Sequence, residues 1–221
     1  MKKKQFLVIG LGRFGESVAK TLYELGNDVL AIDSDGTVIQ EISDHVTHAA
    51  QVEVIDENNL KALGVGNFDV AIIAMGTDVQ ASIMATILVK ELGVKYIIAK
   101  ASNDLHAKVL YKIGADRVVF PERDMGVRVA HNLRSSNILD FIELSPDYTI
   151  AEMVSLDEWH GKTLKQLNVR AVYGVNIVAI KRNDVVVNVS PAADDVIEPG
   201  DVIVAIGAAD ALSHLESLVT K

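Results

Sequence analysis

The feature that most constrains this chain is an apolar run over residues 6–9 that leads directly into Gly10-Leu11-Gly12-Arg13-Phe14-Gly15. This G-x-G-x-x-G pattern is followed by an amphipathic stretch over 16–25 and by a second apolar run that ends at Asp33. The order of strand, glycine loop, helix, strand and acid is typical of a dinucleotide-binding βαβ unit. We therefore expect residues 6–33 to form such a unit.

The residues of this loop are expected to have separate roles. Gly10 permits the tight turn after the strand, Gly12 lets the backbone approach a phosphate, and Gly15 lets the helix pack closely on the sheet. The free N–H groups and the positive dipole at the helix start favour an anion. Asp33 is expected to accept hydrogen bonds from ribose hydroxyls. The alternative is a glycine-rich turn that only packs a helix on a sheet.

Short apolar runs alternate with helical patterns through the first part of the chain, with strands expected at 6–10, 29–33, 47–50, 70–75, 96–100 and 117–120, and helices at 15–25, 38–44, 57–63, 80–92 and 103–113. Nearly continuous apolar strands in repeated β-α units predict an α/β fold with a Rossmann-type, doubly wound parallel sheet.

The later part of the chain has a different pattern, which predicts a small α+β domain. We expect strands at 149–154, 175–181, 185–189 and 202–206, a hairpin turn at 182–184, and helices at 165–167 and 208–218. The predicted limits are a nucleotide-binding domain over 1–137, a connection over 138–146 and a second domain over 147–221.

The charge balance supports this division and excludes one class of partner. The net charge is −9, and it is uneven: residues 1–137 carry 15 Lys and Arg against 17 Asp and Glu, whereas 138–221 carry 6 against 13. An acidic chain is not expected to bind nucleic acid. The absence of cysteine, of a secretory signal pattern and of a long apolar stretch predicts a cytosolic location.

The sequence carries no catalytic constellation. It has no G-x-S-x-G, no cysteine and no Walker loop, and its six histidines show no metal-binding spacing. We therefore expect a binding protein and not an enzyme. Two other classes remain as alternatives: a small NAD-dependent oxidoreductase that uses NAD(H), and a redox sensor of the DNA-binding repressor type.

Three segments together identify a family resemblance: the G-L-G-R-F-G loop, Phe120-Pro121-Glu122-Arg123-Asp124-Met125, and 173–180. Their order and spacing resemble the RCK (KTN) regulatory subunits of Ktr-type bacterial potassium uptake systems, of the KtrA/KtrC-like kind. The resemblance implies an RCK-N domain that binds ATP or ADP and a smaller RCK-C domain. It also implies homodimers that assemble into an octameric ring beneath an integral membrane potassium-translocating subunit, at the inner face of the membrane.

Several charged residues have both a ligand-binding and a simpler interpretation. Arg13, which precedes Phe14 in the loop, is either a solvated residue or a cation for phosphate, and the resemblance implies that it senses the γ-phosphate across the dimer. Asp35 is either a second ribose contact or a helix N-cap. Lys100 ends the fifth strand, where it either contacts ligand or is solvated.

Two further residues concern the base and the cation. At 52–55 the chain has Val-Glu-Val-Ile, where the family carries a small residue, Asp or Asn, a small residue and Ser or Thr. We expect Glu53 to contact adenine, although the difference from the family pattern predicts altered recognition of the base. The resemblance implies that Glu122 ligates Mg²⁺ or Ca²⁺. A carboxylate that faces a polyphosphate would be repelled unless such a cation lies between them.

The resemblance also implies a cyclic di-AMP pocket in the second domain. Arg170 is expected to pair with phosphate, Asn176 to make an amide contact, and Ile177 and Pro191 to sandwich a base. The alternative is that Asn176 and Ile177 belong to an ordinary buried strand. ATP and ADP are expected to bias the ring through different contacts, and cyclic di-AMP to bias it towards inactivity.

Overall fold

The computed structural model describes residues 3–134, 138–145, 147–182 and 186–219. It divides into two compact units, Met1–Arg123 and Asp124–Lys221, and each is described by itself. This division falls before the predicted domain limit at residue 137. Residue 137 and residue 146, the last of the expected connection, lie outside the described residues. The functional domain limits 1–137 and 147–221 stay a prediction.

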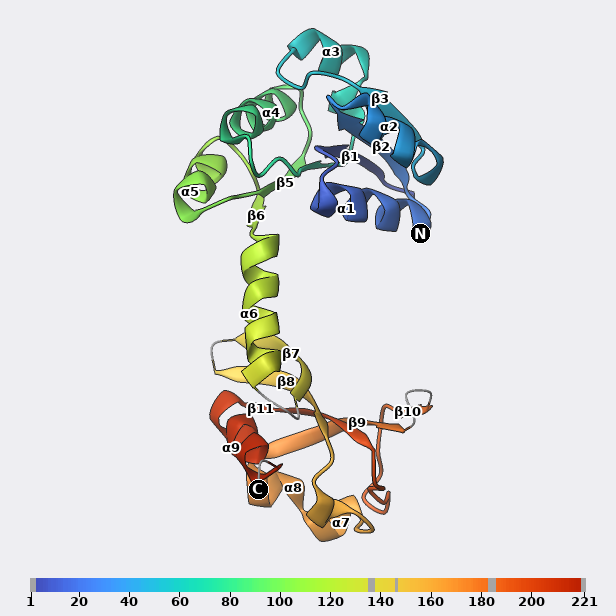
Figure 1. Cartoon of the computed structure of the whole chain (residues 1–221), viewed down its shortest axis with the longest axis vertical. Helices are drawn as coiled ribbons and strands as arrows, with labels where there is room; N and C mark the ends of the chain where they lie inside the picture. The colour runs from blue at the N-terminus through green and yellow to red at the C-terminus, as the bar shows by residue number, and fades with distance from the viewer. Residues whose placement is uncertain (1–2, 135–137, 146, 183–185, 220–221) are drawn as a thin grey trace. The chain divides into compact units, whose positions relative to one another are not determined.

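The first unit contains a six-stranded parallel sheet in the order β3-β2-β1-β4-β5-β6 (Figure 1). Its strands are β1 (Gln5–Ile9), β2 (Asp28–Asp33), β3 (His48–Gln51), β4 (Val70–Ile73), β5 (Tyr96–Lys100) and β6 (Arg117–Val119). The helices between them are α1 (Arg13–Glu24), α2 (Gly36–Ile42), α3 (Glu57–Ala62), α4 (Val79–Glu91) and α5 (Asp104–Lys112), and α6 (Pro121–Arg134) follows β6. The predicted Rossmann-type fold is confirmed.

Helices cover both faces of this sheet, which explains its nearly continuous apolar strands. On one face, residues of α3, α4 and α5 pack with Leu7 and Ile9 of β1. On the other face, α1 and α2 pack with Val8. Successive side chains of a strand point to opposite faces, so the single strand β1 supplies both cores.

The helices start at the carboxyl edge of the sheet, where polar side chains cap them. Asp35, Asp56, Asp78 and Asn103 accept hydrogen bonds from backbone N–H groups in the first turns of α2, α3, α4 and α5 respectively. Such caps satisfy donors that have no acceptor within the helix. The carboxyl ends of parallel strands and the starts of these helices therefore gather at one edge.

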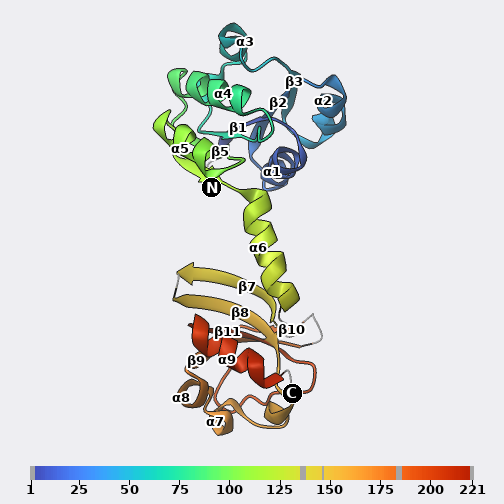
Figure 2. The same ribbon diagram turned by 60° about the vertical axis from the view of Figure 1, so that its left-hand side comes forward.

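The second unit contains a five-stranded antiparallel sheet in the order β10-β9-β11-β8-β7. Its strands are β7 (Ile138–Ser145), β8 (Tyr148–Val154), β9 (Val175–Arg182), β10 (Val186–Asn188) and β11 (Val202–Ala208), and its helices are α7 (Leu164–Leu167), α8 (Val169–Tyr173) and α9 (Ala209–Val219). Figure 2 shows α9 against the sheet, near α8. The predicted small α+β domain is confirmed as a fold.

The sequence interpretation of the second unit needs one correction. Residues 138–145, expected as a connection, form the edge strand β7, which pairs with β8. The pairing has two register shifts, so its polar and apolar residues do not follow a simple alternation. Residues 183 and 184 of the expected hairpin turn lie outside the described residues. Within the described ranges, no helix is long and apolar enough to cross a bilayer.

Candidate functional site

A cavity of about 560 Å³ lies at the carboxyl edge of the first unit's sheet. Ligands of open α/β sheets bind where the strand order reverses, and here it reverses between β1 and β4. The cavity is lined from both sides of this point, by Ile9, Gly10, Asp33, Ser34, Val52, Glu53, Val54, Ile55, Met75, Asp78, Gln80, Ala81 and Met84. The structure thus brings together three of the predicted site residues: Gly10, Asp33 and Glu53.

The glycine loop turns sharply at this edge, as the sequence predicts. Gly10 has φ +88°, a left-handed conformation that favours glycine. A Cβ on Gly15 would lie 1.9 Å from the carbonyl oxygen of Gly10, so the helix and the turn touch backbone to backbone. Gly12 is the N-cap of α1, and a Cβ there would meet no atom within 4 Å. The start of α1 therefore has free space beside N–H groups that no side chain caps.

Asp33 holds the glycine loop against the end of β2. Its Oδ2 accepts a hydrogen bond from the N–H of Leu11 at 2.7 Å, and its Oδ1 accepts one from the N–H of Asp35 at 3.0 Å. Each carboxylate oxygen keeps a second lone pair that can accept from a ligand hydroxyl. The sequence predicted a ribose acceptor at this position, whereas its bracing of the loop was missed.

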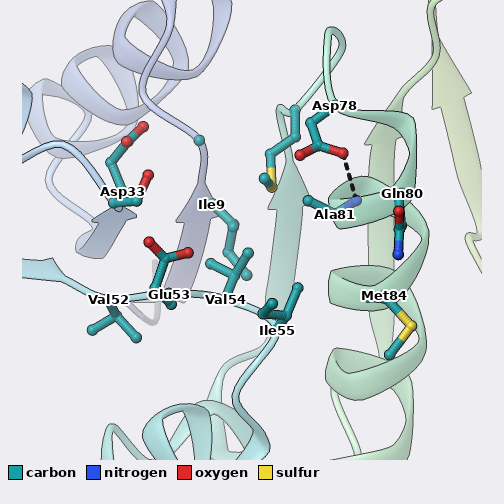
Figure 3. Close-up of a pocket in the computed structure, with 13 residues that line it drawn as sticks. Ile9, Asp33, Val52, Glu53, Val54, Ile55, Asp78, Gln80, Ala81 and Met84 are labelled. Atoms are coloured by element: carbon teal, nitrogen blue, oxygen red, sulfur yellow. Dashed lines mark hydrogen bonds between the residues drawn. The ribbon is translucent and has the colours of Figure 1, made fainter.

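The two walls of the cavity come from different parts of the chain (Figure 3). Asp33 and Glu53 line it from one side, and Gln80 and Met84 of α4 line the other. Sequence reasoning missed the α4 wall. The available signal was Asp78, an N-cap residue that closely follows an apolar strand and accepts from the N–H of Ala81 at 2.9 Å.

Besides Gly12 and Gly15 of the glycine loop, four other residues predicted for the nucleotide site lie outside this lining. Arg13 is exposed at the first position of α1, and Phe14 packs against the core that α1 and α2 cover. The Asp35 side chain is the N-cap of α2 and accepts from the N–H of Thr37 at 2.8 Å. The N-cap role left open for Asp35 is therefore present, and a ribose contact stays a prediction. The fourth residue, Lys100, pairs with Glu122.

Lys100, the last residue of β5, forms an ion pair with Glu122 in the first turn of α6. The Lys100 Nζ lies 2.5 Å from the Glu122 Oε1, and the lysine side chain is 15% exposed against 72% for the glutamate. The pKa of Glu122 is lowered, first by the hydrogen bond from Lys100. Within the described part of the chain, no three His, Cys, Asp or Glu side chains are placed to hold a metal ion. A divalent cation at Glu122 would need further ligands from bound phosphates or a second copy.

Replacement of Lys100 by methionine is expected to raise the pKa of Glu122 towards that of an ordinary glutamate, because the principal stabiliser of its charged form is lost. Carbon-detected NMR of the Glu122 carboxyl group during a pH titration measures this shift. Lys108→Met, on α5, is the matched control and should leave the midpoint unchanged. An unchanged Glu122 midpoint in Lys100→Met would contradict the ion pair.

A second cavity, of about 200 Å³, lies in the second unit where α7 and α8 meet the start of β9. Its lining is Leu164, Asn168, Val169, Arg170, Val175, Asn176 and Ile177. Three of the four residues predicted for cyclic di-AMP, Arg170, Asn176 and Ile177, therefore line one cavity, and Pro191 does not. Among the described residues, the lining contains one arginine and no carboxylate, so its local charge is opposite to that of the acidic second domain.

Ser155, His160 and Asp157 have the residue types of a hydrolase triad, but their geometry does not match one. The Ser155 Oγ lies 3.0 Å from the His160 Nε2, whereas the His160 Nδ1 lies 3.9 Å from the Asp157 Oδ1, which is too long for a hydrogen bond. Ser155 is 3% exposed, so its hydroxyl is closed to a substrate. The contact between Ser155 and His160 links the residue directly after β8 to the loop five residues further along the chain.

Comparison with known proteins defines the class. Residues 6–121 match the TrkA-N domain and residues 149–220 match the TrkA-C domain. The chain therefore belongs to the TrkA-N/TrkA-C family, as a regulatory RCK subunit of the Ktr potassium uptake type. This confirms the resemblance found from the motifs.

The individual similarities extend over nearly the full chain. The chain is 49% identical over 217 residues to the Ktr system potassium uptake protein C of Bacillus subtilis (strain 168), with 98% of each chain covered. It is 44% identical over 207 residues to the Ktr system potassium uptake protein A of the same strain, covering 94% of this chain and 93% of that one. The crystal structure of the GsuK RCK domain matches with a TM-score of 0.70 and 19% identity, over 100% of this chain and 48% of that chain, which supports the fold alone.

Proposed function

We propose that this chain is a cytoplasmic, ligand-gated subunit that binds ATP or ADP in its first unit and thereby controls potassium flux through a membrane partner. The observation that carries the proposal is the cavity at the strand-order reversal, where Gly10 and Asp33 stand beside the uncapped start of α1. In this arrangement the phosphates lie at the helix start and the ribose lies on Asp33. The potassium uptake function named for its relatives supplies the partner class.

Control requires that ATP and ADP make different contacts, because a ligand shifts a conformational equilibrium only through differential affinity. Arg13 is the cation nearest in sequence to the phosphate-binding turn, and it projects from the first turn of α1 into solvent. In a homodimer that assembles into an octameric ring, it reaches the γ-phosphate of a neighbouring site. Many identical sites then add their small preferences to drive the membrane subunit.

Replacement of Arg13 by methionine is expected to weaken ATP binding by at least about tenfold and ADP binding by less than about threefold, because only ATP carries the γ-phosphate. Isothermal titration calorimetry of the full chain with each nucleotide gives both affinities. Arg117→Met, at the amino end of β6, is the matched control. Equal losses for ATP and ADP in Arg13→Met would contradict the γ-phosphate role, and NADH in the same assay tests the oxidoreductase alternative.

A divalent cation, Mg²⁺ or Ca²⁺, is proposed between Glu122 and the bound phosphates. Such an ion would compete with Lys100 for the Glu122 carboxylate. In the same titrations, added Mg²⁺ should strengthen ATP binding to the native chain and have no effect on Glu122→Gln. An equal Mg²⁺ effect in both would remove Glu122 from the proposal.

The second unit is proposed to bind cyclic di-AMP in the cavity that contains Arg170, Asn176 and Ile177, and to bias the assembly towards inactivity. A two-fold symmetric ligand fits an interface between two identical subunits. Arg170 supplies the charge for phosphate and Asn176 a directional amide. Pro191 contributes only if a second copy or a loop movement brings it to the ligand, since it does not line this cavity.

A further inference from the structure

The two ends of the first cavity indicate where the base of a bound nucleotide would lie. Asp33 is tied to the glycine loop through the N–H of Leu11, so it marks the phosphate end. Glu53 lies two residues beyond β3, and the N–H of Val52 bonds to the carbonyl oxygen of Asp33 at 2.9 Å. A nucleotide with its phosphates at the loop and its ribose on Asp33 therefore extends its base towards Glu53, between the apolar walls that include Ile55 and Met84.

The Glu53 carboxylate is available to such a base. It is exposed and points into the cavity (Figure 3). Among the residues that the structure describes, none donates a hydrogen bond to it or pairs with it as a cation. The described lining has three carboxylates, those of Asp33, Glu53 and Asp78, and no lysine or arginine. Among the described residues, both oxygens of the Glu53 carboxylate are therefore open to donors from a ligand.

The chemistry of a carboxylate determines which base it reads best. A carboxylate has two acceptor oxygens and no donor. The Watson–Crick edge of guanine presents two adjacent donors, N1–H and N2–H, and these match the two oxygens in a bidentate pair. Adenine presents one donor, N6–H, beside the acceptor N1, which would face the second oxygen without a proton between them. Glu53 can thus make two hydrogen bonds to guanine and one to adenine.

We propose that Glu53 sets the base specificity of this site, so that guanine nucleotides bind at least as tightly as adenine nucleotides. The inference rests on the proposed nucleotide site and names its ligand class more narrowly. The Glu53 stem is one methylene longer than that of an aspartate, so it extends its carboxylate further into the cavity. An adenine nucleotide still binds through its ribose, phosphates and one N6–H contact, so the site accepts both purines.

The test is a pair of calorimetric titrations of the full chain with GDP and ADP. The native chain should bind GDP with a Kd equal to or below that for ADP, and inosine diphosphate, which lacks the N2 amino group, should fall between them. Glu53→Gln places a donor and an acceptor at the same position, so adenine gains a second hydrogen bond while the charge-assisted pair to guanine is replaced by neutral hydrogen bonds. The ratio of the GDP Kd to the ADP Kd should then rise by at least about tenfold.

Glu57→Gln is the matched control, because Glu57 lies on α3, pairs with Lys61 at 2.6 Å and does not line the cavity. Its GDP-to-ADP ratio should equal that of the native chain. If the native chain binds ADP more than about twofold tighter than GDP, the specificity inference is wrong and the nucleotide site stands. An unchanged ratio in Glu53→Gln also overturns it. Binding of neither nucleotide overturns the proposed function and this inference together.

Discussion

Replacement of Gly15 by alanine is expected to unfold the first unit, with a loss of more than about 4 kcal/mol in its free energy of unfolding. The added Cβ would lie 1.9 Å from the carbonyl oxygen of Gly10 and 2.9 Å from the Cβ of Ala74. The Gly10 carbonyl belongs to the turn that ends β1, one of the two central strands of the sheet. Relief of the clash would have to move α1 away from that strand. Chemical denaturation followed by circular dichroism measures the loss.

Gly12→Ala is the matched substitution in the same loop, and its expected result is different. Its Cβ would meet no protein atom within 4 Å, and Gly12 has φ −63°, which alanine adopts without strain. The stability should change by about 1 kcal/mol or less, the cost of alanine at an N-cap. Nucleotide affinity should fall by at least about tenfold, because the methyl group occupies the phosphate approach. Native stability in Gly15→Ala, or native affinity in Gly12→Ala, would contradict this division of roles.

Replacement of Arg182 by methionine is expected to destabilise the second unit clearly more than Lys181→Met does, because it leaves a buried carboxylate without its cation. Asp201 is 1% exposed, and Arg182 donates from Nε and Nη2 to its two oxygens at 2.9 Å each. Lys181→Met is the control on the same strand, since the pair of Lys181 with Glu152 is partly exposed. That control should cost no more than about 1 kcal/mol.

The Arg182–Asp201 pair also predicts an acid sensitivity. The hydrogen bond from Arg182 is the main reason that the pKa of Asp201 is lowered. The contribution of this ion pair to the free energy of unfolding is therefore fully present above the pKa of an unfolded aspartate, near 4. It is lost as the pH falls through the lower pKa of Asp201 in the folded chain. Arg182→Met should show a shallower loss of stability over this range than the native chain. The double variant with Asp201→Asn should cost less than the sum of the single variants, and additive costs would contradict the coupling.

The fold of the first unit was predictable because its signals are local. Each strand is an apolar run, and the glycine loop with Asp33 defines the first βαβ unit. The strand β7 was not predictable in the same way, because it is an edge strand with an irregular alternation and two register shifts. Its identity comes from pairing with β8, which is a tertiary property.

Site residues were predictable where they belong to the first βαβ unit or to the strand that follows it. Gly10, Asp33 and Glu53 lie at the ends of β1, β2 and β3, and all three line the cavity. The α4 wall was missed, because the strand order brings β4 beside β1 across a long stretch of sequence. The pairing of Lys100 with Glu122 was also missed, although β5 and β6 are neighbours in the sequence and in the sheet, because each side chain was considered only as a ligand contact.

Hydrogen–deuterium exchange of the full chain, with and without ADP and with and without cyclic di-AMP, tests the central claim most directly. ADP should slow exchange in the segments 10–15, 33–35 and 52–55, which form the first cavity and its glycine loop, and leave 164–177 unchanged. Cyclic di-AMP should protect 164–177 and leave the glycine loop unchanged. Protection by ADP in the second unit, or no protection of 10–15 at saturating ADP, would contradict the assignment of the nucleotide site to the first unit.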